Sequence, residues 1–534
     1  MTDAIPRRTV LVAATAGLAG ALVARDVRTA HADVPAHDPF GLGVASGDPL
    51  PQSVILWTRL VAPDPTAATP YAPRSVEVEW EVARDEAFGQ VVQRGTAWAH
   101  RDLAHSVHVD VGGLQPGTDY HYRFRVGGHV SPAGRTRTAP ALGSLPAATR
   151  WAVVNCQDWQ NGYWPTFTGL AQEDLDVVLH VGDYIYEYDP ASAFPDRRHT
   201  TPDVLGLDQL RTLGDYRARH AQYKTDPALQ AAHLAFPWIV AWDDHETENN
   251  YAGLVDEVDD TGARHQDPAE FARQRAAAYQ AYYEHMPIRP KLRKDAGSYK
   301  IYRGFEFGRL ARLDILDTRQ YRTDQPGGHP SDFGPDADGR GNAAGTMTGP
   351  EQEAWLLRRL RHSGAVWDVV AQQTLMSPIR FPDFLGSGQP FIRNLDQWDG
   401  YQPQRARLLQ ALVDEQVRNP VVLSGDIHST WLSDLHLRQD DPTSPVVATE
   451  FCSTSISSSF PAAFDPVLKA WNPGANPHVK YFDGSRHGYL RLDITAERCR
   501  VDVRTVPTIA TRVAPVTTSA SYATEAGSPG VVPA

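Results

Sequence analysis

Hydrophobic and polar residues alternate one by one in the first third of the chain. The runs Val76–Val82 and Tyr120–Val126 carry an apolar residue at every second position. This alternation is typical of β-strands that bury one side and expose the other. Turn-forming residues and a tyrosine, within Leu114–Tyr120, precede the second run, as at a corner of a β-sandwich. We therefore predict an all-β, immunoglobulin- or fibronectin-like domain at residues 33–140.

A stretch rich in Pro, Gly, Ala and Ser at residues 132–149 is typical of a linker, and the pattern changes after it. Short apolar runs, each long enough for a buried strand, now alternate with longer segments of helical spacing. The predicted strands are Trp151–Asn155, Val177–Val181, Trp238–Trp242, Leu310–Leu316, Val366–Ala371 and Val421–Ser424. Helices are predicted at residues 207–223 and 350–360, the second opening with a proline suited to a first helical turn. The pattern predicts an α/β (α+β) layered domain at residues 150–510.

The two ends of the chain differ from the rest. Residues 1–32 combine Arg7 and Arg8 with an uncharged run, Thr9–Ala24, and end in Ala-His-Ala. This pattern favours a twin-arginine-type signal peptide, because the apolar run is shorter than the ~20 residues that cross a bilayer. We expect a secreted, extracellular or wall-associated protein that uses the twin-arginine export machinery and has no permanent membrane anchor. Residues 511–534 show no clear period and are predicted to be an extended or disordered C-terminal tail.

Composition and charge narrow the classes of function. The 534 residues are 42% hydrophobic and 22% charged, which permits a large core and excludes wholesale disorder. The formal net charge of −13 argues against binding to a nucleic-acid backbone and makes metal cations more natural partners.

The chain has three cysteines, an odd number for an exported protein. Cys156 follows a predicted strand, whereas Cys452 and Cys499 both lie in the C-terminal part. We therefore hypothesise a disulfide between Cys452 and Cys499, with Cys156 left as a free thiol.

Side chains that bind metals gather where the predicted strands end. The blocks are Gly182-Asp183-Tyr184-Ile185-Tyr186, Trp242-Asp243-Asp244-His245-Glu246 and Gly425-Asp426-Ile427-His428. Any one of them alone is more often a solvated turn. Three together, joined by Cys156 after a fourth strand, predict a two-metal site. Thiolate, phenolate, imidazole and carboxylate donors favour a redox-capable or hard trivalent ion at one position and an oxygen-loving divalent ion at the other.

These blocks, in this order, resemble those of the PhoD-like alkaline phosphatase and phosphodiesterase family, within the calcineurin-like metallophosphoesterase superfamily. Further segments that carry the resemblance are Phe40–Pro49, Ile55–Arg59, Leu316–Arg319 and Asp396–Tyr401. The resemblance spans most of the chain after residue 32. It implies the layered α/β sandwich of that superfamily, preceded by the family's N-terminal domain.

The resemblance implies a binuclear centre of Fe3+ and Ca2+. Cys156, Asp183, Tyr186 and His428 would hold the iron, with the cysteine where the wider superfamily usually has an Asp-x-His pair.

On the calcium side, Asp183 would bridge to the second ion, with Asp244 and Asp426 as further ligands. Asp244 occupies the place of an asparagine in the superfamily, so Asp243 remains a rival for that role.

The implied activity is hydrolysis of phosphate mono- and diesters by attack of a metal-bound hydroxide. His245 is the candidate for protonating the leaving oxygen or stabilising the transition state; the alternative is a histidine that only supports the ligands. Arg319 and Arg322 follow an apolar strand and could reach the mouth of the site, but an arginine in such a place is more often a surface ion-pair partner. We therefore assign them no catalytic role.

Two other functions remain open. Related secreted enzymes with similar blocks favour a phospholipase D-like phosphodiesterase that acts on phospholipids, and a wall phosphopolymer is a further candidate substrate. The remote alternative is a non-catalytic wall-binding protein whose β-domain makes the contacts.

Overall fold

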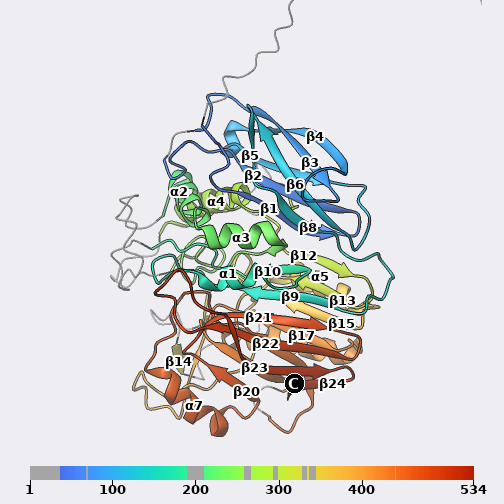
Figure 1. Ribbon diagram of the computed structural model, residues 1–534. Coiled ribbons are helices and arrows are strands. Elements are labelled where there is room, and N and C mark those ends of the chain that lie inside the picture. Colours follow the sequence, from blue (N-terminus) through green and yellow to red (C-terminus); the bar gives the residue numbers. More distant parts are fainter. Residues whose placement is uncertain are drawn as a thin grey trace, which may run out of the picture.

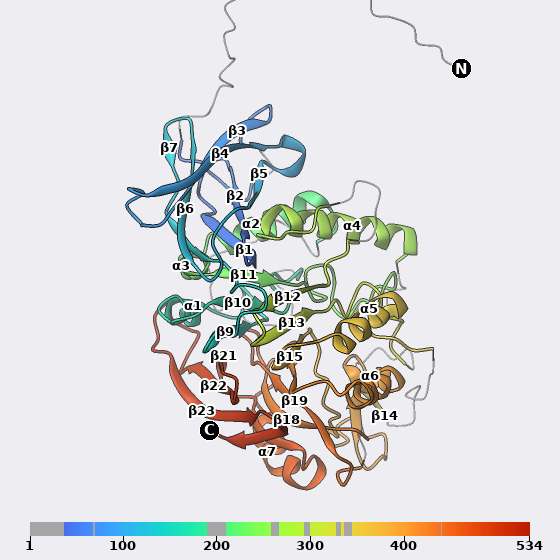
Figure 2. The same ribbon diagram turned by 90° about the vertical axis from the view of Figure 1, so that its right-hand side faces the viewer.

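A computed structural model of the chain describes residues 37–67, 70–188, 210–257, 266–292, 299–326, 333–335, 344–438 and 441–534. Two large β-sheets pack face to face, helices cover their outer faces, and a smaller sheet lies at one end (Figures 1 and 2). The predicted signal peptide at 1–32 and the start of the helix predicted at 207–223 lie outside the described residues.

The first sheet has ten strands in the order β24-β23-β22-β21-β9-β10-β11-β1-β2-β5. Its centre consists of the parallel strands β9 (Thr149–Val154), β10 (Val177–His180) and β11 (Pro237–Val240), which confirm three predicted strands. Their continuous apolar runs follow from burial on both faces. The antiparallel strands β21 (His487–Ile494) and β22 (Arg498–Val506) extend the sheet beyond β9.

The second sheet has seven strands in the order β12-β13-β15-β17-β19-β18-β20. The strands β13, β15, β17 and β19 run parallel, and the first three confirm predicted strands. The bounds are β12 (Arg303–Phe307), β13 (Ala311–Ile315), β15 (Trp367–Ala371), β17 (Pro420–Ser424), β18 (Thr430–His436), β19 (Val446–Cys452) and β20 (Val479–Asp483).

The main apolar core lies between the two sheets. Val153 and Leu179 of the first sheet belong to the same buried cluster as Leu313, Val369 and Leu423 of the second. The outer face of the first sheet packs against α1 (Pro165–Leu170), α2 (Leu213–Lys224), α3 (Pro227–Ala235) and α4 (Pro268–His285). The outer face of the second sheet packs against α5 (Gly349–Arg361) and α6 (Gln402–Asp414) (Figure 2). The layered α/β prediction is confirmed, and so is the helix predicted at 350–360.

The N-terminal region is a sandwich that shares a sheet with the α/β part. Strand β1 pairs in parallel with β11, with Ser46 opposite Pro237, so the first sheet continues through β2 and β5. A smaller sheet packs on β2 and β5 through a common apolar cluster. The bounds are β1 (Val44–Leu50), β2 (Ser53–Arg59), β5 (Ser106–Val111) and, in the smaller sheet, β3 (Val76–Ala83), β4 (Val91–Ala99), β6 (Asp119–Val126), β7 (His129–Val130) and β8 (Gly134–Arg137), with the 3-10 turn η1 (Arg101–Leu103) before β5.

Both alternating runs of this region form strands as predicted, β3 and β6. The hydroxyl of Tyr120 accepts a hydrogen bond from the backbone N–H of Gln115 at 2.8 Å, as expected at a sandwich corner. The more specific immunoglobulin or fibronectin type stays a prediction. Strand β8 lies inside the stretch predicted as a linker, where Tyr120 pairs with Thr136, so that part of the linker prediction is wrong.

The C-terminal residues form the edge of the first sheet. Strands β23 (Thr517–Glu525) and β24 (Ser528–Pro533) pair antiparallel after β22, so the extended form of the predicted tail is confirmed and a disordered tail is wrong. No alternation of apolar and polar residues marks β23, because most of its side chains are small or polar and only its end is buried. Backbone hydrogen bonds, which need no particular side chain, hold this edge.

The disulfide prediction is also wrong. All three cysteines lie within the described residues, and each is a buried free thiol. Cys452 belongs to β19 of the second sheet, whereas Cys499 belongs to β22 of the first and packs in the core between the sheets. Both behave as small apolar side chains.

Three further elements lie near the site, β14 (Phe333–Pro335), β16 (Ile392–Asn394) and α7 (Phe464–Ala475), with the 3-10 turn η2 (Trp398–Tyr401) between β16 and α6. Among the helices of the described residues, none is both long and apolar enough to cross a membrane.

Candidate metal centre

The predicted metal ligands meet at the carboxyl ends of strands from both sheets. Cys156 follows β9, Asp183 follows β10 and Asp244 follows β11 in the first sheet, while Asp426 and His428 follow β17 in the second. Loops at the carboxyl ends of parallel strands are where α/β proteins place their sites.

Four of these residues have left-handed backbone conformations. Cys156, Asp183, Asp426 and His428 have φ values of 54°, 58°, 67° and 56°. Residues with a Cβ adopt this region at an energetic cost, and such strain is concentrated at functional sites. The loops are therefore shaped to aim particular side chains.

The glycines of two blocks are required by close contacts. A Cβ on Gly182, whose φ is 124°, would lie 2.4 Å from the Cβ of Asp243, and a Cβ on Gly425 would lie 2.6 Å from the Asn155 side chain. Glycine before each aspartate therefore lets neighbouring loops approach closely enough to share a site.

The four residues predicted to hold iron lie together. The Cys156 thiol lies 3.3 Å from Oδ2 of Asp183, and the Tyr186 hydroxyl donates to the same oxygen at 3.0 Å. The Tyr186 hydroxyl also lies 3.2 Å from Nε2 of His428. One ligand atom each from Cys156, Asp183 and His428 falls within a 4.8 Å span, which a single cation can bridge.

A second group of possible ligands consists of carboxylates. Asp183, Asp243, Asp244 and Asp426 each offer an oxygen within a 4.8 Å span, so Asp183 belongs to both groups and both rivals for the calcium role are present. The two rivals, Asp243 and Asp244, differ in their hydrogen-bond partners. Asp243 accepts from Nε of Arg319, whereas Asp244 accepts the backbone N–H of Asn250 at 2.6 Å and has its other oxygen 3.3 Å from the Arg319 guanidinium.

An unpaired oxygen lies where the two groups meet. Oδ1 of Asp183 is buried and has no hydrogen-bond partner among the described residues. Buried carboxylate oxygens are nearly always paired, and a cation held between the two ligand groups would pair this one. The mixed donors of the first group and the oxygen donors of the second therefore fit two metal ions of different type.

Burial and mutual repulsion disfavour the charged forms of Asp183 and Cys156. Burial raises the pKa of Asp183 well above its usual range, and the neighbouring Asp244 and Glu246 raise it further against the opposing effect of His245. Burial, followed by Asp183 and Asp426, likewise raises the pKa of the Cys156 thiol. A cation in the cluster would reverse this preference and stabilise the thiolate and carboxylates.

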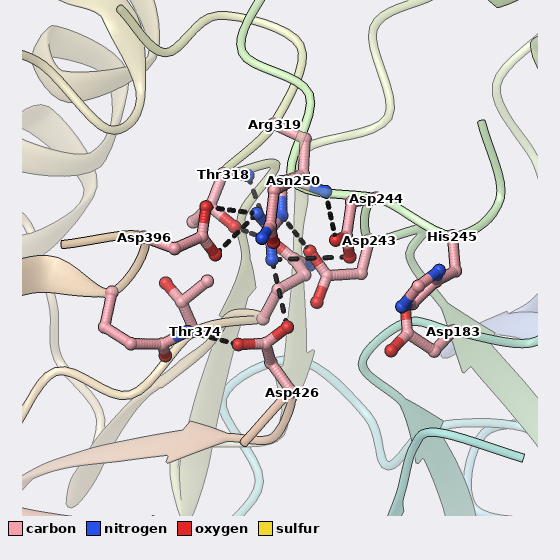
Figure 3. Close-up of polar contacts among 12 residues, drawn as sticks. Asp183, Asp243, Asp244, His245, Asn250, Thr318, Arg319, Thr374, Asp396 and Asp426 are labelled. Atoms are coloured by element: carbon pink, nitrogen blue, oxygen red, sulfur yellow. Dashed lines mark hydrogen bonds and ion pairs between the residues drawn. The ribbon is translucent and has the colours of Figure 1, made fainter. Parts of the chain in front are cut away.

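Arg319 lies at the centre of the carboxylates, which corrects the expectation that it is a surface residue. Its side chain is fully buried, and Figure 3 shows it between Asp396 on one side and Asp243 and Asp244 on the other. It donates to both oxygens of Asp396, at 3.0 and 2.8 Å, and to Asp426 at 3.0 Å.

Arg322, also expected at the surface, is buried too and donates to Asp396 at 2.6 Å. Sequence reasoning therefore missed Asp396 as a member of the site, although it opens one of the segments that carry the family resemblance.

His245 is held in one orientation. Its Nδ1 lies 2.8 Å from Oε2 of the buried Glu187, and its ring stacks on Tyr186 with the ring centres 4.1 Å apart. Burial lowers the pKa of His245, but Glu187, Asp244 and Asp183 outweigh burial and the net direction is upward. Glu187 was missed, although it follows Tyr186 directly in the sequence.

Glu246, the last residue of the acidic block, ties two loops together. Its carboxylate accepts the backbone N–H groups of Asp183, Tyr184 and Asp243, at 3.1, 2.7 and 2.8 Å. Glu246 is therefore engaged with backbone and does not face the ligand cluster.

A cavity of about 360 Å³ opens onto this cluster. Asp244, His245, Asp426 and His428 line one side of it. A molecule in the cavity therefore reaches both ligand groups and the histidine.

Comparisons with known proteins agree with this geometry. The family model described as PhoD-like phosphatase matches residues 151–503, and the model for its N-terminal domain matches residues 26–140. The chain is 42% identical over 493 residues to alkaline phosphatase D of Bacillus subtilis (strain 168), an alignment that covers 91% of this chain and 80% of the relative.

Solved structures agree as well. The chain matches a structure of PhoD with a TM-score of 0.85 and 40% identity, over 93% of this chain and 92% of the other. It also matches a purple acid phosphatase from yellow lupin seeds, with a TM-score of 0.50 and 13% identity over 87% and 71% of the two chains, which shows a shared fold. The chain belongs to the PhoD-like phosphatase family, as its sequence blocks indicate.

Proposed function

We propose that this protein is an exported hydrolase of phosphate mono- and diesters that works with a binuclear metal site. The observation that carries the proposal is Asp183, a buried carboxylate shared by two ligand groups, with one oxygen left unpaired. Its relative in Bacillus subtilis is an alkaline phosphatase, which supports this class of reaction.

Cys156, Asp183, Tyr186 and His428 would hold Fe3+, and Asp183, Asp244 and Asp426 would hold Ca2+. We assign Asp244 rather than Asp243 to calcium because Asp244, like Asp426, lines the cavity, whereas Asp243 does not line it and accepts from Nε of Arg319. When bound, such a pair of cations supplies an activated water and neutralises negative charge on the phosphoryl group.

His245 is proposed as the proton donor to the leaving oxygen. Because its Nδ1 is engaged by Glu187, the other ring nitrogen, Nε2, is left for the substrate in the cavity. Glu187 fixes the ring orientation and stabilises the imidazolium form.

Arg319 is proposed as a positioning residue. It binds Asp426 and lies beside Asp244, so it holds two calcium ligands while its charge offsets part of theirs. Asp396 and Asp243 in turn fix the guanidinium.

The proposed export route is the twin-arginine machinery, read from residues 1–32. A phospholipid or a wall phosphopolymer remains a candidate for the natural substrate. Burial of the ligand set beneath a cavity supports an enzyme over a wall-binding protein.

The test uses the protein recovered after export, with para-nitrophenyl phosphate as monoester and bis(para-nitrophenyl) phosphate as diester. We expect hydrolysis of both, loss of both activities on chelation of calcium, and recovery on adding Ca2+. Full activity after the metals have been removed would contradict the proposal.

A further inference from the structure

The cavity above the ligand cluster has a second, apolar side. This side consists of Phe333, Phe381, Phe384, Phe460, Phe464 and Leu468. None of these residues belongs to the metal-ligand blocks, and they come from well-separated parts of the chain.

The aromatic rings of this wall touch one another. Phe384 lies edge-on to Phe333 and Phe464, with ring centres 4.9 and 5.0 Å apart, and Phe333 lies 5.2 Å from Phe381. Strand β14, the segment after β15 and the start of α7 therefore build one continuous aromatic surface.

Phe381 and Leu468 belong to a buried core cluster, and the other residues of the wall pack on it or on one another and are more exposed. Phe384 is 41% exposed, and Phe333, Phe460 and Phe464 are only partly buried. Contiguous apolar side chains left in contact with solvent are typical of ligand-binding surfaces.

Apart from His245 at the metal site, the described lining of the cavity offers no cationic side chain to a ligand. Among its lining residues in the described part of the chain, none is Lys or Arg, whereas Asp244, Asp396 and Asp426 are acidic. The nearby Arg319 and Arg322 are fully buried and committed to carboxylates. Beyond the metal site, a second phosphate or a carboxylate on the substrate would meet no Lys or Arg among the lining residues that the structure describes.

We propose that the site selects phosphoesters that carry a single phosphate next to an uncharged aromatic or alkyl group, and discriminates against substrates with further negative groups. The proposal rests on the proposed function, which places the phosphate at the ligand cluster. The rest of the substrate must then lie along the cavity, whose other lining residues are mainly the aromatic wall and uncharged polar side chains.

Binding of phosphonates tests this independently of turnover. Isothermal titration calorimetry on the metal-loaded protein would compare methylphosphonate, phenylphosphonate and para-carboxyphenylphosphonate. We expect phenylphosphonate to bind about tenfold more tightly than methylphosphonate, because its ring buries apolar surface. The added carboxylate should weaken binding again by about tenfold, because it is desolvated without a partner.

Variants locate the effect. Phe384→Ala and Phe464→Ala should each reduce the preference for phenylphosphonate at least about threefold and leave methylphosphonate binding unchanged. Leu385→Ala is the matched control, since Leu385 is 46% exposed beside Phe384 and does not line the cavity. Equal affinity for the methyl and phenyl compounds, or equal effects of Phe384→Ala and Leu385→Ala, would overturn the proposal.

Hydrolysis is measured separately, with methyl and phenyl diesters that share a para-nitrophenolate leaving group. If the protein hydrolyses both diesters but binds phenylphosphonate no more tightly than methylphosphonate, this inference is refuted and the proposed function stands. A phosphonate preference in a protein that hydrolyses neither ester would support the aromatic wall and refute the proposed function.

Discussion

The guanidinium of Arg319 donates to both carboxylate oxygens of Asp396, at 3.0 and 2.8 Å, in the interior of the protein. The same guanidinium also contacts Asp243, Asp244 and Asp426. Each of these carboxylates is buried, or nearly so, and depends on the arginine for part of its charge compensation.

Replacement of Arg319 is therefore expected to be strongly destabilising. Arg319→Met should lower the free energy of unfolding by about 3–5 kcal/mol, because it leaves buried carboxylates unpaired. Denaturant unfolding of the metal-free protein measures this, with the exposed Arg358→Met on α5 as the control. Equal stability of the two variants would show that the carboxylates do not need the arginine.

Cys156→Ala tests the proposed iron ligand. The variant should lose iron, the visible charge-transfer band of an iron-bound thiolate or phenolate, and activity by about a hundredfold or more. Elemental analysis and an absorption spectrum are the measurements. Cys499→Ala removes a buried thiol in the core between the sheets and should keep metal and activity. Unchanged iron in Cys156→Ala would refute the assignment.

His245→Gln tests the proposed proton donor. Turnover should fall by about 100-fold to 10,000-fold with metal content intact, because the proton is lost and the ligands remain. Glu187→Gln should give a smaller fall, since the ring keeps a hydrogen bond but loses its charged partner. If His245→Gln instead loses its metal together with its activity, His245 has a structural role.

Asp244 and Asp243 can be separated by calcium binding. Asp244→Ala should weaken Ca2+ affinity by about tenfold or more, because a ligand is removed from the shell. Asp243→Ala should keep most of that affinity and lose stability instead, because Asp243 is paired with Arg319. Calcium titration of the two variants decides between them, and the reverse pattern would exchange their roles.

Lys224 gives stability an unusual dependence on pH. Its ammonium is buried 3.1 Å from the Tyr184 hydroxyl and 4.5 Å from the centre of the Trp57 ring, and burial lowers its pKa from 10.5 to about 7. Between these two values the unfolded chain binds more protons than the native protein, so this group makes stability rise with pH.

Lys224→Met removes that contribution. The variant should have a higher free energy of unfolding than the parent protein. The difference between the two should be largest at pH 7 and about 3 kcal/mol smaller at pH 10. Denaturant unfolding across that range measures it, with the exposed Lys469→Met as the control. Parallel stability curves for Lys224→Met and the parent protein would contradict the prediction.

The sequence predicts local features well and the contacts between distant segments poorly. The strands β9, β10 and β17 and the aspartates after them follow from short runs of residues, because burial on both faces and the turn after each strand are local properties. The pair of Arg319 and Asp396 joins positions 77 residues apart, and neither residue's surroundings show in the sequence near it.

Two other features were not apparent from the sequence either. The aromatic wall draws on Phe333, Phe384 and Phe464, which look like ordinary core residues when each is considered alone. Strand β23 is held by its backbone at a sheet edge, so its side chains carry little periodic signal.

The order of strands in the first sheet also has a consequence for synthesis of the protein. Strand β9 near the sheet centre pairs with β21, where Val153 lies opposite Leu490. One side of the strand that leads to Cys156 is therefore open until residues 487–494 have left the ribosome. Contacts so distant along the chain form late in folding. Translation products that stop before residue 487 therefore cannot complete the sheet beside β9.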